Sequence, residues 1–316
     1  MTGKISENRK GSLFRKFMWI AGWLILMDVT IGSLLRYFYF RQEAGEIYRT
    51  VNAFDKTEAD LLIFGSSTAS HNFHPNAFNG YINGSFYNTG RDGCTIFYQY
   101  ALLKSVLKRY TPKIIILNFD QAEFIDEPET YDHLSALLPF YRDHPEIRDI
   151  IELKSPYEKV KLFSQIYPFN SYIFSIAIGS SKQNKMRRGD YQGYVPLDGS
   201  LKGPLQNGST IVDFAIDPVK VQYYKYFMEA CKLAGVKLIV VCSPFHVKPN
   251  YELYNTQLGK KITEGYGLSF NNYSKDSMFL KHPEYFDDIS HLNDKGALIF
   301  SRIVARLAFE DQRSHP

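Results

Sequence analysis

The stretch LLIFGSSTAS, residues 61–70, constrains the fold of this chain more than any other. A short apolar run that ends at Gly65 is typical of a buried strand followed by a turn. Gly65 has no Cβ and tolerates a positive φ, so the chain can turn sharply there. Open α/β sheets bind ligands beyond the carboxyl ends of their strands. We therefore expect the hydroxyl groups of Ser66, Ser67 and Thr68 to lie in a site at that edge.

Other apolar runs also have the length of buried strands, and they alternate with segments of helical periodicity. This alternation favours a parallel sheet covered by helices on both faces. The prediction is an α/β fold of three layers (α/β/α), flavodoxin-like, with a mainly parallel sheet. The further strands are expected at 85–88, 113–119 and 236–246, and the helices at 96–110, 221–235 and 297–307.

A second chemical signal lies near the carboxyl terminus, in FDDISHLNDKGA at residues 286–297. Asp288 and His291 are three positions apart, so the carboxylate can orient the imidazole within one turn. An imidazole held in this way can accept the proton of Ser67 and make its oxygen a nucleophile. Asn293 is expected to cap the helix that follows.

These two blocks resemble those of the SGNH (GDSL-like) hydrolase superfamily. The superfamily's first block ends in Gly-Asp-Ser, which here reads Gly-Ser-Ser and places Ser67 at the nucleophile position. Its last block, Asp-x-x-His, is intact from Asp288 to His291. The resemblance implies a Ser67–His291–Asp288 triad that needs no metal and no cofactor, in an SGNH-like domain at residues 58–310.

The same resemblance suggests where an oxyanion would bind. It implies that the backbone N–H groups of Ser67 and Gly90 stabilise the negative charge. The superfamily's third block supplies an asparagine amide, but here Asp120 falls at that position and Asn118 lies two residues earlier. An ionised carboxylate would repel an oxyanion. The third donor is therefore left open between Asn118, Gln121 and a protonated Asp120, or the site has only the two backbone donors and Asp120 has another role.

The amino terminus predicts a membrane anchor. Residues 1–16 are basic, and the apolar run that begins at residue 17 is long enough to cross a bilayer as a helix. We expect a cytoplasmic tail at 1–16, a retained signal anchor at 17–40 and a solvated helical connector at 41–57. Basic residues favour the cytoplasmic side, which places the rest of the chain outside the cytoplasm. A cleaved signal is the alternative. Asp28, a carboxyl group within the span, is expected to be protonated or paired with another helix.

Residues 122–215 do not fit a compact sheet, so we interpret them as an insertion beside the active-site edge. This insertion contains a basic, glycine-rich loop whose Arg188 could meet an anionic substrate, a lipid headgroup or a partner, or could simply be solvated. His246 follows a predicted strand and could line the cleft as a substrate-binding residue, or serve as a rival base, although it has no carboxylate nearby. His71 is expected to be a surface or turn residue.

Composition excludes several classes of function. A net charge of +4 is too small to indicate nucleic-acid binding. The three cysteines have no metal-ligand spacing, and Cys231 and Cys242 are expected to be buried thiols. We see no sequence signal for a metal or a cofactor.

The expected function is that of an esterase or O-acyltransferase of the bacterial cell envelope. SGNH-like proteins tethered in this way resemble those that add or remove acetyl or other acyl groups on polysaccharides. The implied partners are an acylated glycan, the lipid bilayer around 17–40 and a membrane-embedded acyl donor protein. The catalytic domain would lie in the periplasm or outside the cytoplasmic membrane. The alternative is a non-catalytic envelope protein of the same fold that binds glycan or a membrane partner.

Overall fold

The computed structural model describes residues 2–81, 84–179, 190–203, 215–247 and 254–310. In this part of the chain, a sheet of five parallel strands has the order β2-β1-β3-β4-β5. The α/β class and the parallel sheet are confirmed. The strands are β1 (Leu61–Phe64), β2 (Phe86–Asn88), β3 (Ile114–Asn118), β4 (Lys237–Cys242) and β5 (Phe270–Asn272).

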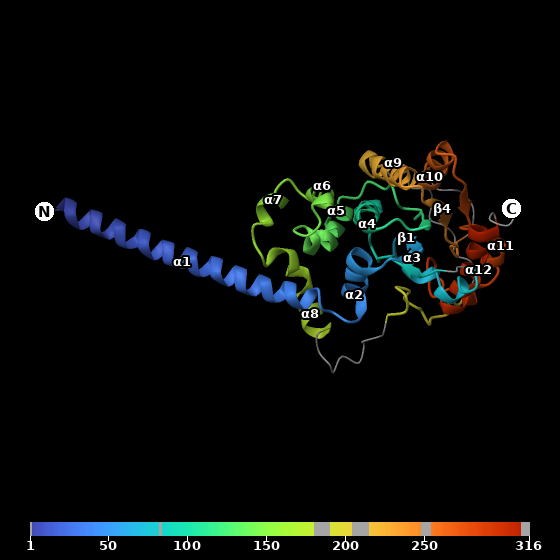
Figure 1. Ribbon diagram of the computed structural model, residues 1–316, viewed down its shortest axis with the longest axis horizontal. Coiled ribbons are helices and arrows are strands. Elements are labelled where there is room, and N and C mark those ends of the chain that lie inside the picture. The colour runs from blue at the N-terminus through green and yellow to red at the C-terminus, as the bar shows by residue number, and fades with distance from the viewer. Residues whose placement is uncertain (1, 82–83, 180–189, 204–214, 248–253, 311–316) are drawn as a thin grey trace.

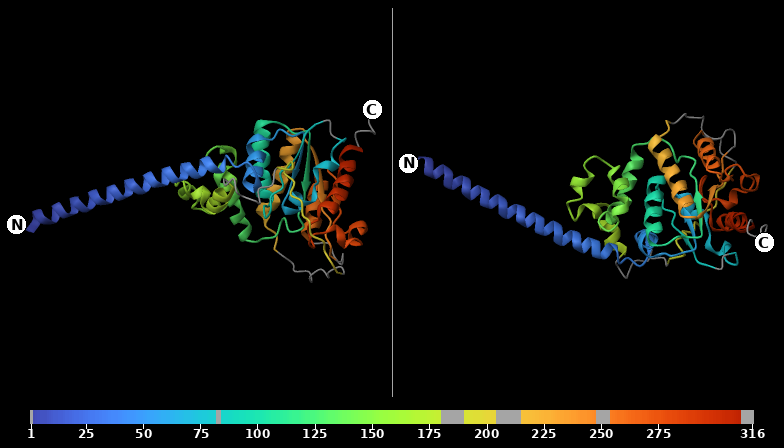
Figure 2. Two further views of the ribbon diagram at one scale, coloured as in Figure 1. Left: turned by 90° about the horizontal axis from the view of Figure 1, so that it is seen from below. Right: turned by 45° about the horizontal axis from the view of Figure 1, so that its top comes forward.

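Helices cover both faces of this sheet (Figures 1 and 2). On one face α4 and α9 pack together, and on the other α3 packs against α12. The α-helices are α1 (Thr2–Tyr39), α2 (Gly45–Val51), α3 (Ser67–Asn72), α4 (Ile96–Arg109), α5 (Glu129–Asp132), α6 (Arg148–Glu152), α7 (Glu158–Lys161), α8 (Ile173–Gly179), α9 (Pro218–Leu233), α10 (Tyr254–Gly265), α11 (Ser277–Leu280) and α12 (Asp294–Glu310).

Local sequence explains how the helices next to the site begin and end. Asn293 accepts the N–H of Gly296 at 3.0 Å, which is the expected cap of α12. The helix α4 ends in Lys108 and Arg109, two cations that interact favourably with the negative end of the helix dipole.

Strand β1 is fully buried, and its Phe64 packs edge-on against Phe227 of α9. Burying such a side chain stabilises the fold by about 2–3 kcal/mol.

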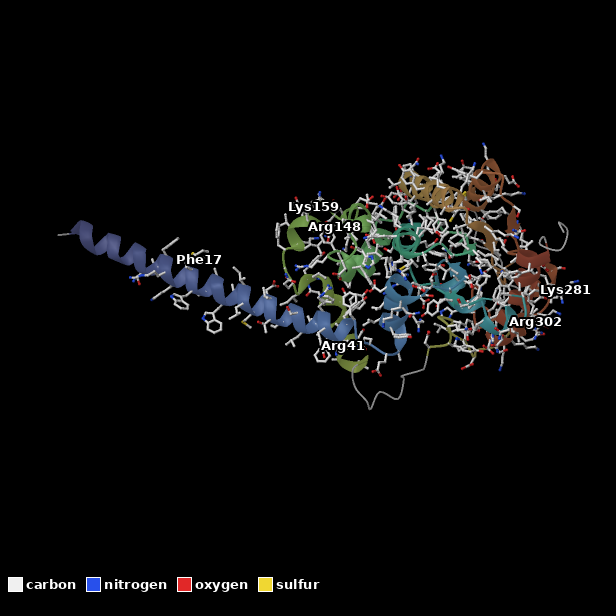
Figure 3. All side chains as sticks on the ribbon, in the orientation of Figure 1. Phe17, Arg41, Arg148, Lys159, Lys281 and Arg302 are labelled. Atoms are coloured by element: carbon white, nitrogen blue, oxygen red, sulfur yellow. The ribbon has the colours of Figure 1, made fainter. Side chains whose placement is uncertain are left out.

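The amino-terminal helix α1 extends away from the globular domain (Figure 1). Its Gly11–Tyr39 portion is long and apolar enough to cross a membrane, and the most apolar window within it is only 6% buried. Figure 3 shows its side chains, with Phe17 labelled, standing free of the domain along most of this length. A helix with the length and composition that the prediction requires is therefore present, and it continues without a break through the basic residues that precede it.

Residues 41–57 differ from the solvated connector that we expected. They are helical, but their apolar side chains are part of the domain core. Ile47 and Val51 of α2 are buried, and Phe54, in the π-helical turn Asn52–Lys56, stacks on Phe140 with ring centroids 4.4 Å apart. The apolar spacing of this segment serves packing against the insertion, so the domain begins soon after α1 ends.

The described part of the insertion forms short helices up to Gly179 and is irregular over residues 190–203. It comprises α5 to α8 and 3₁₀ turns at His133–Phe140, Pro145–Ile147 and Tyr167–Tyr172. These elements lie at the end of the domain from which α1 extends (Figure 1). Asp28 of α1 accepts hydrogen bonds from the Ser164 hydroxyl at 2.5 Å and from the Gln165 N–H at 2.7 Å. The partner of Asp28 is thus the segment before a short turn of the insertion, whereas we had expected a protonated carboxyl or pairing with another helix.

Candidate active site

Ser67 lies at the first position of α3, directly beyond the carboxyl end of β1. The turn depends on Gly65, whose φ is +148°. A Cβ on this residue would lie 2.7 Å from the Ala69 Cβ and 2.8 Å from the Asn118 carbonyl oxygen, too close for any other side chain. The strand therefore ends in a turn that only glycine can make, and this turn presents Ser67 at the sheet edge.

His291 lies within hydrogen-bond distance of Ser67, although the two residues are 224 positions apart. Its Nε2 is 2.8 Å from the Ser67 Oγ, and its Nδ1 is 2.8 Å from Oδ2 of Asp288. Because Nδ1 faces a carboxylate, it carries the ring proton, and Nε2 is left to accept the serine proton. The three residues predicted as a triad thus form one hydrogen-bonded chain.

Asp288 is fixed by more than the imidazole. Its Oδ1 also accepts the backbone N–H groups of Ser290 at 2.8 Å and His291 at 2.9 Å. Burial raises the pKa of Asp288, but hydrogen bonds from His291 and Ser290 and the charge of His291 lower it by more. The pKa is therefore below its usual value, and the carboxylate stays ionised while it orients the ring.

Two of the proposed oxyanion donors have other partners in this structure. The N–H of Gly90 donates to Oδ1 of Asn88 at 2.9 Å. The side chain of Asn118 has no exposed surface: its amide nitrogen donates to Thr68 at 2.6 Å, and its oxygen accepts the hydroxyl of Ser243 at 2.7 Å. Asn118 therefore connects Thr68 and Ser243 by hydrogen bonds beneath the site, and it cannot contact a substrate in this conformation.

Asp120 lies beside Ser66, and neither of its two hydrogen bonds is part of an oxyanion-binding site. Its Oδ2 accepts the Ser66 hydroxyl at 2.8 Å, and its Oδ1 accepts the N–H of Ala122 at 2.9 Å. The Ser67 N–H belongs to the first turn of α3, where backbone donors have no acceptor within the helix. Ser67 thus supplies both the hydroxyl and an N–H group that can face a substrate oxygen.

His71 contacts His291, which the sequence did not predict. It is buried, contrary to the expected surface position, and its ring meets that of His291 edge-on with centroids 5.3 Å apart. Its Nδ1 lies 2.7 Å from the Val195 carbonyl oxygen and its Nε2 lies 3.4 Å from Asp92. Burial lowers the pKa of His71, but these two acceptors raise it above its usual value. The available signal was the four-residue spacing from Ser67, which places both side chains on one face of α3.

Residues 190–203, here called the strap, connect the two halves of the site. The strap belongs to the insertion and is held by backbone hydrogen bonds. The Val195 N–H donates to Ser70 in α3 at 3.0 Å, and the Leu201 N–H donates to Phe286 at 2.8 Å. In addition, the Gly199 N–H donates to the Asp287 carboxylate at 2.6 Å. The strap therefore fixes α3, which carries Ser67, relative to the loop that carries Asp288.

The structure describes one of the two residues that were proposed to bind substrate. Arg188 lies outside the described residues. His246 is 1% exposed, its ring lies 5.2 Å from that of Phe286, and its backbone N–H donates to Ile289 at 2.8 Å. His246 is therefore buried under the loop that carries Asp288 and packs against it. It does not line a cleft.

The site has the geometry for nucleophilic chemistry at a carbonyl carbon. A serine hydroxyl is hydrogen-bonded to an imidazole, and a carboxylate orients that imidazole. Among the described residues there is no group of three or more His, Cys, Asp or Glu side chains that could hold a metal ion. The three cysteines are buried and unbridged.

No protein-family model matches the chain, and no curated protein resembles it at a significant level.

Proposed function

We propose that this chain is a serine-dependent esterase or O-acyltransferase. The observation that carries the proposal is the continuous hydrogen-bonded chain from Ser67 through His291 to Asp288. The Ser67 oxygen attacks the ester carbonyl carbon while His291 takes the serine proton. The bond to the alcohol then breaks, and His291 returns the proton to the departing oxygen. Water or a sugar hydroxyl releases the acyl group from Ser67 by the same steps in reverse.

The fold supports an SGNH-type assignment within this proposal. The strand order β2-β1-β3-β4-β5 is that of flavodoxin-like sheets. The nucleophile follows β1 at the carboxyl edge of the sheet, and the Asp-x-x-His block directly precedes the last helix, α12. This is the arrangement that the resemblance to the superfamily implied.

The membrane helix directs the choice of substrate. With its basic end in the cytoplasm, α1 would hold the catalytic domain on the outer side of a bacterial cytoplasmic membrane. The acyl esters within reach there are those of cell-envelope polysaccharides, and acetyl is the smallest of these groups. A membrane-embedded acyl donor protein would supply the group if the reaction is a transfer.

A non-catalytic binding role is the second candidate, and the oxyanion side of the site favours it. The Gly90 N–H and the Asn118 amide both have other partners, and Asp120 stands where an asparagine was expected. A binding protein would need none of these donors. Turnover of a simple ester separates the two candidates, because only the enzyme releases the alcohol.

Replacing Asp288 with asparagine is expected to lower kcat by about 10²–10⁴-fold with little change in KM. Asparagine keeps the shape of the side chain but no longer stabilises the imidazolium that forms during attack. The measurement is hydrolysis of an activated acetyl ester by the purified full-length protein in detergent.

The matched control for this variant is Asp287→Asn. Asp287 is the adjacent carboxylate, and it accepts the Gly199 N–H of the strap instead of the imidazole. An asparagine oxygen can still accept that hydrogen bond, so activity should stay close to that of the wild type. Equal losses in the two variants would show that the charge of the loop matters and that Asp288 has no special role.

A further inference from the structure

The insertion carries large apolar side chains that the domain leaves in solvent. They lie at the start of α7 and on it, on the segment after it and on α8, and each is more than half exposed. Isolated exposed apolar residues are ordinary, but several gathered on one end of a domain mark an interaction surface. We call this set the apolar rim: Tyr157, Val160, Phe163, Phe174 and Ile178.

The rim lies beside the membrane helix. Phe163 is 82% exposed, and it directly precedes Ser164, whose hydroxyl bonds to Asp28 of α1. One turn later along α1, a Cβ at Gly32 would overlap the backbone of Gln165, so helix and insertion are in close contact. Phe163 is therefore held next to the point where α1 meets the domain.

Helix α8 continues this surface along the later part of α1. Ile176 is buried on the side that faces the core, and its carbonyl oxygen accepts the side-chain amide of Gln42 at 3.5 Å. Phe174 and Ile178 are four residues apart, so they share the opposite, exposed face. The apolar surface of α1 thus continues onto the insertion.

The length of α1 indicates how deep the domain sits. The apolar run that precedes the Asp28 contact spans residues 17–27 and rises about 16 Å. The hydrocarbon core of a bilayer is about 30 Å thick. The remaining depth, about 14 Å, must be filled by the part of α1 that the insertion flanks. The exposed edge of the insertion next to α1 then lies in the outer leaflet.

We propose that the apolar rim inserts into the outer interfacial layer of the bilayer that α1 crosses and contacts lipid there. The proposal rests on α1 being a membrane anchor and does not depend on the ester chemistry. Tyrosine, phenylalanine and lysine side chains together are typical of membrane interfaces. Lys159 and Lys161 flank Val160, and Figure 3 shows Lys159 on the insertion, at the end of the domain nearest to α1. The domain is thereby held against the membrane surface at a fixed orientation.

Asp28 fits this arrangement. Both of its oxygens accept hydrogen bonds from the insertion: Ser164 and Ile166 donate to Oδ1, and Gln165 donates to Oδ2. A carboxylate that is satisfied by three donors can sit close to acyl chains without exposing its charge to them. Phe163 of the rim directly precedes the residues that make this contact.

Depth-dependent fluorescence quenching tests the proposal on the full-length chain. Trp19 and Trp23 are the two tryptophans of the protein, so replacing both by phenylalanine gives a silent background. Into this background we would introduce Phe163→Trp or Phe174→Trp, and reconstitute each protein in vesicles of phosphatidylethanolamine and phosphatidylglycerol. The acyl chains would be brominated near their headgroup ends. The matched control is Leu233→Trp, because Leu233 is 88% exposed but lies at the end of α9, away from α1.

The rim tryptophans are expected to lose about half of their fluorescence or more in brominated vesicles, while the Leu233→Trp control is unchanged. A second protein that keeps only Trp23 reports on the anchor. Quenching of Trp23 without quenching of either rim tryptophan would overturn the proposal and leave the rim to a membrane-embedded protein. No quenching of Trp23 would overturn it as well, because α1 would then not be in the bilayer. Neither outcome bears on ester turnover, so a failure of the proposed enzyme is seen separately.

Discussion

Replacing Ser67 with alanine is expected to reduce turnover of an activated acetyl ester by about 10⁴–10⁶-fold. The variant removes the oxygen that attacks the carbonyl carbon, and no neighbouring hydroxyl can take its place at 2.8 Å from the His291 Nε2. Alcohol release and the intact mass of the protein are followed together. The wild type should show release and a transient acetyl adduct, and the variant should show neither.

Ser66→Ala is the control that decides between the two adjacent serines. The Ser66 hydroxyl donates to Asp120 at 2.8 Å, so its loss leaves the contact between Ser67 and His291 in place. We expect this variant to keep at least about a tenth of the wild-type activity, because one hydrogen bond of this kind is worth about 1 kcal/mol. A large loss in Ser66→Ala with retained activity in Ser67→Ala would contradict the assignment of the nucleophile.

Replacing Glu123 with glutamine is expected to make the fold less sensitive to alkaline pH. Glu123 follows β3, is fully buried, and accepts the Ile96 N–H at 2.5 Å. Burial and the charge of Asp120 raise its pKa to about 8, against the opposing effects of Ile96 and Lys220. The pKa of a glutamate in the unfolded chain is about 4.3. The folded protein therefore holds a proton on Glu123 over a range of pH in which the unfolded chain has lost it.

The sign of the effect follows from this difference in bound protons. A raised pKa in the folded state contributes stability that is fully present below about pH 4 and is lost as the pH rises through about 8. Between pH 5 and pH 8 the free energy of unfolding of the wild type should fall by about 3 kcal/mol relative to that of Glu123→Gln. Glutamine keeps the oxygen that accepts the Ile96 N–H and has no proton to lose.

Urea unfolding followed by circular dichroism at the two pH values measures this difference. Glu127→Gln is the matched control, because it makes the same change of charge at an exposed position only four residues away. The control should follow the wild type at both pH values. Parallel pH dependence in the wild type and Glu123→Gln would show that the carboxyl of Glu123 is not held neutral by burial.

Much of the sheet was predictable because most of its strands are continuous apolar runs. β1, β3 and β4 are buried along almost their whole length, and such strands have a clear signal. β5 was missed because its three residues, Phe270–Asn272, include two asparagines and are half-exposed. It is a strand only because it pairs with β4 at the sheet edge. The burial of 41–57 was missed because it depends on the insertion, which the sequence does not place.

The hydrogen-bonded chain of Ser67, His291 and Asp288 could be predicted because each residue belongs to a short block with a chemical pattern. Their surroundings could not, because they depend on contacts between distant segments. The approach of Val195 to His71 spans 124 positions, and no local pattern indicates it. The partners of Gly90 and Asn118 also depend on side chains from several strands, so the resemblance could suggest their roles but not their hydrogen bonds.

The central claim is that Ser67 is an activated nucleophile, and its most direct test is covalent labelling with a fluorophosphonate. This reagent reacts with serines that a neighbouring base has activated. Intact mass and peptide mapping of the full-length chain should show a single adduct on Ser67, which is absent in Ser67→Ala and forms much more slowly in His291→Ala. A folded wild-type protein without an adduct, or with the adduct on Ser66 or Ser290, would contradict the claim.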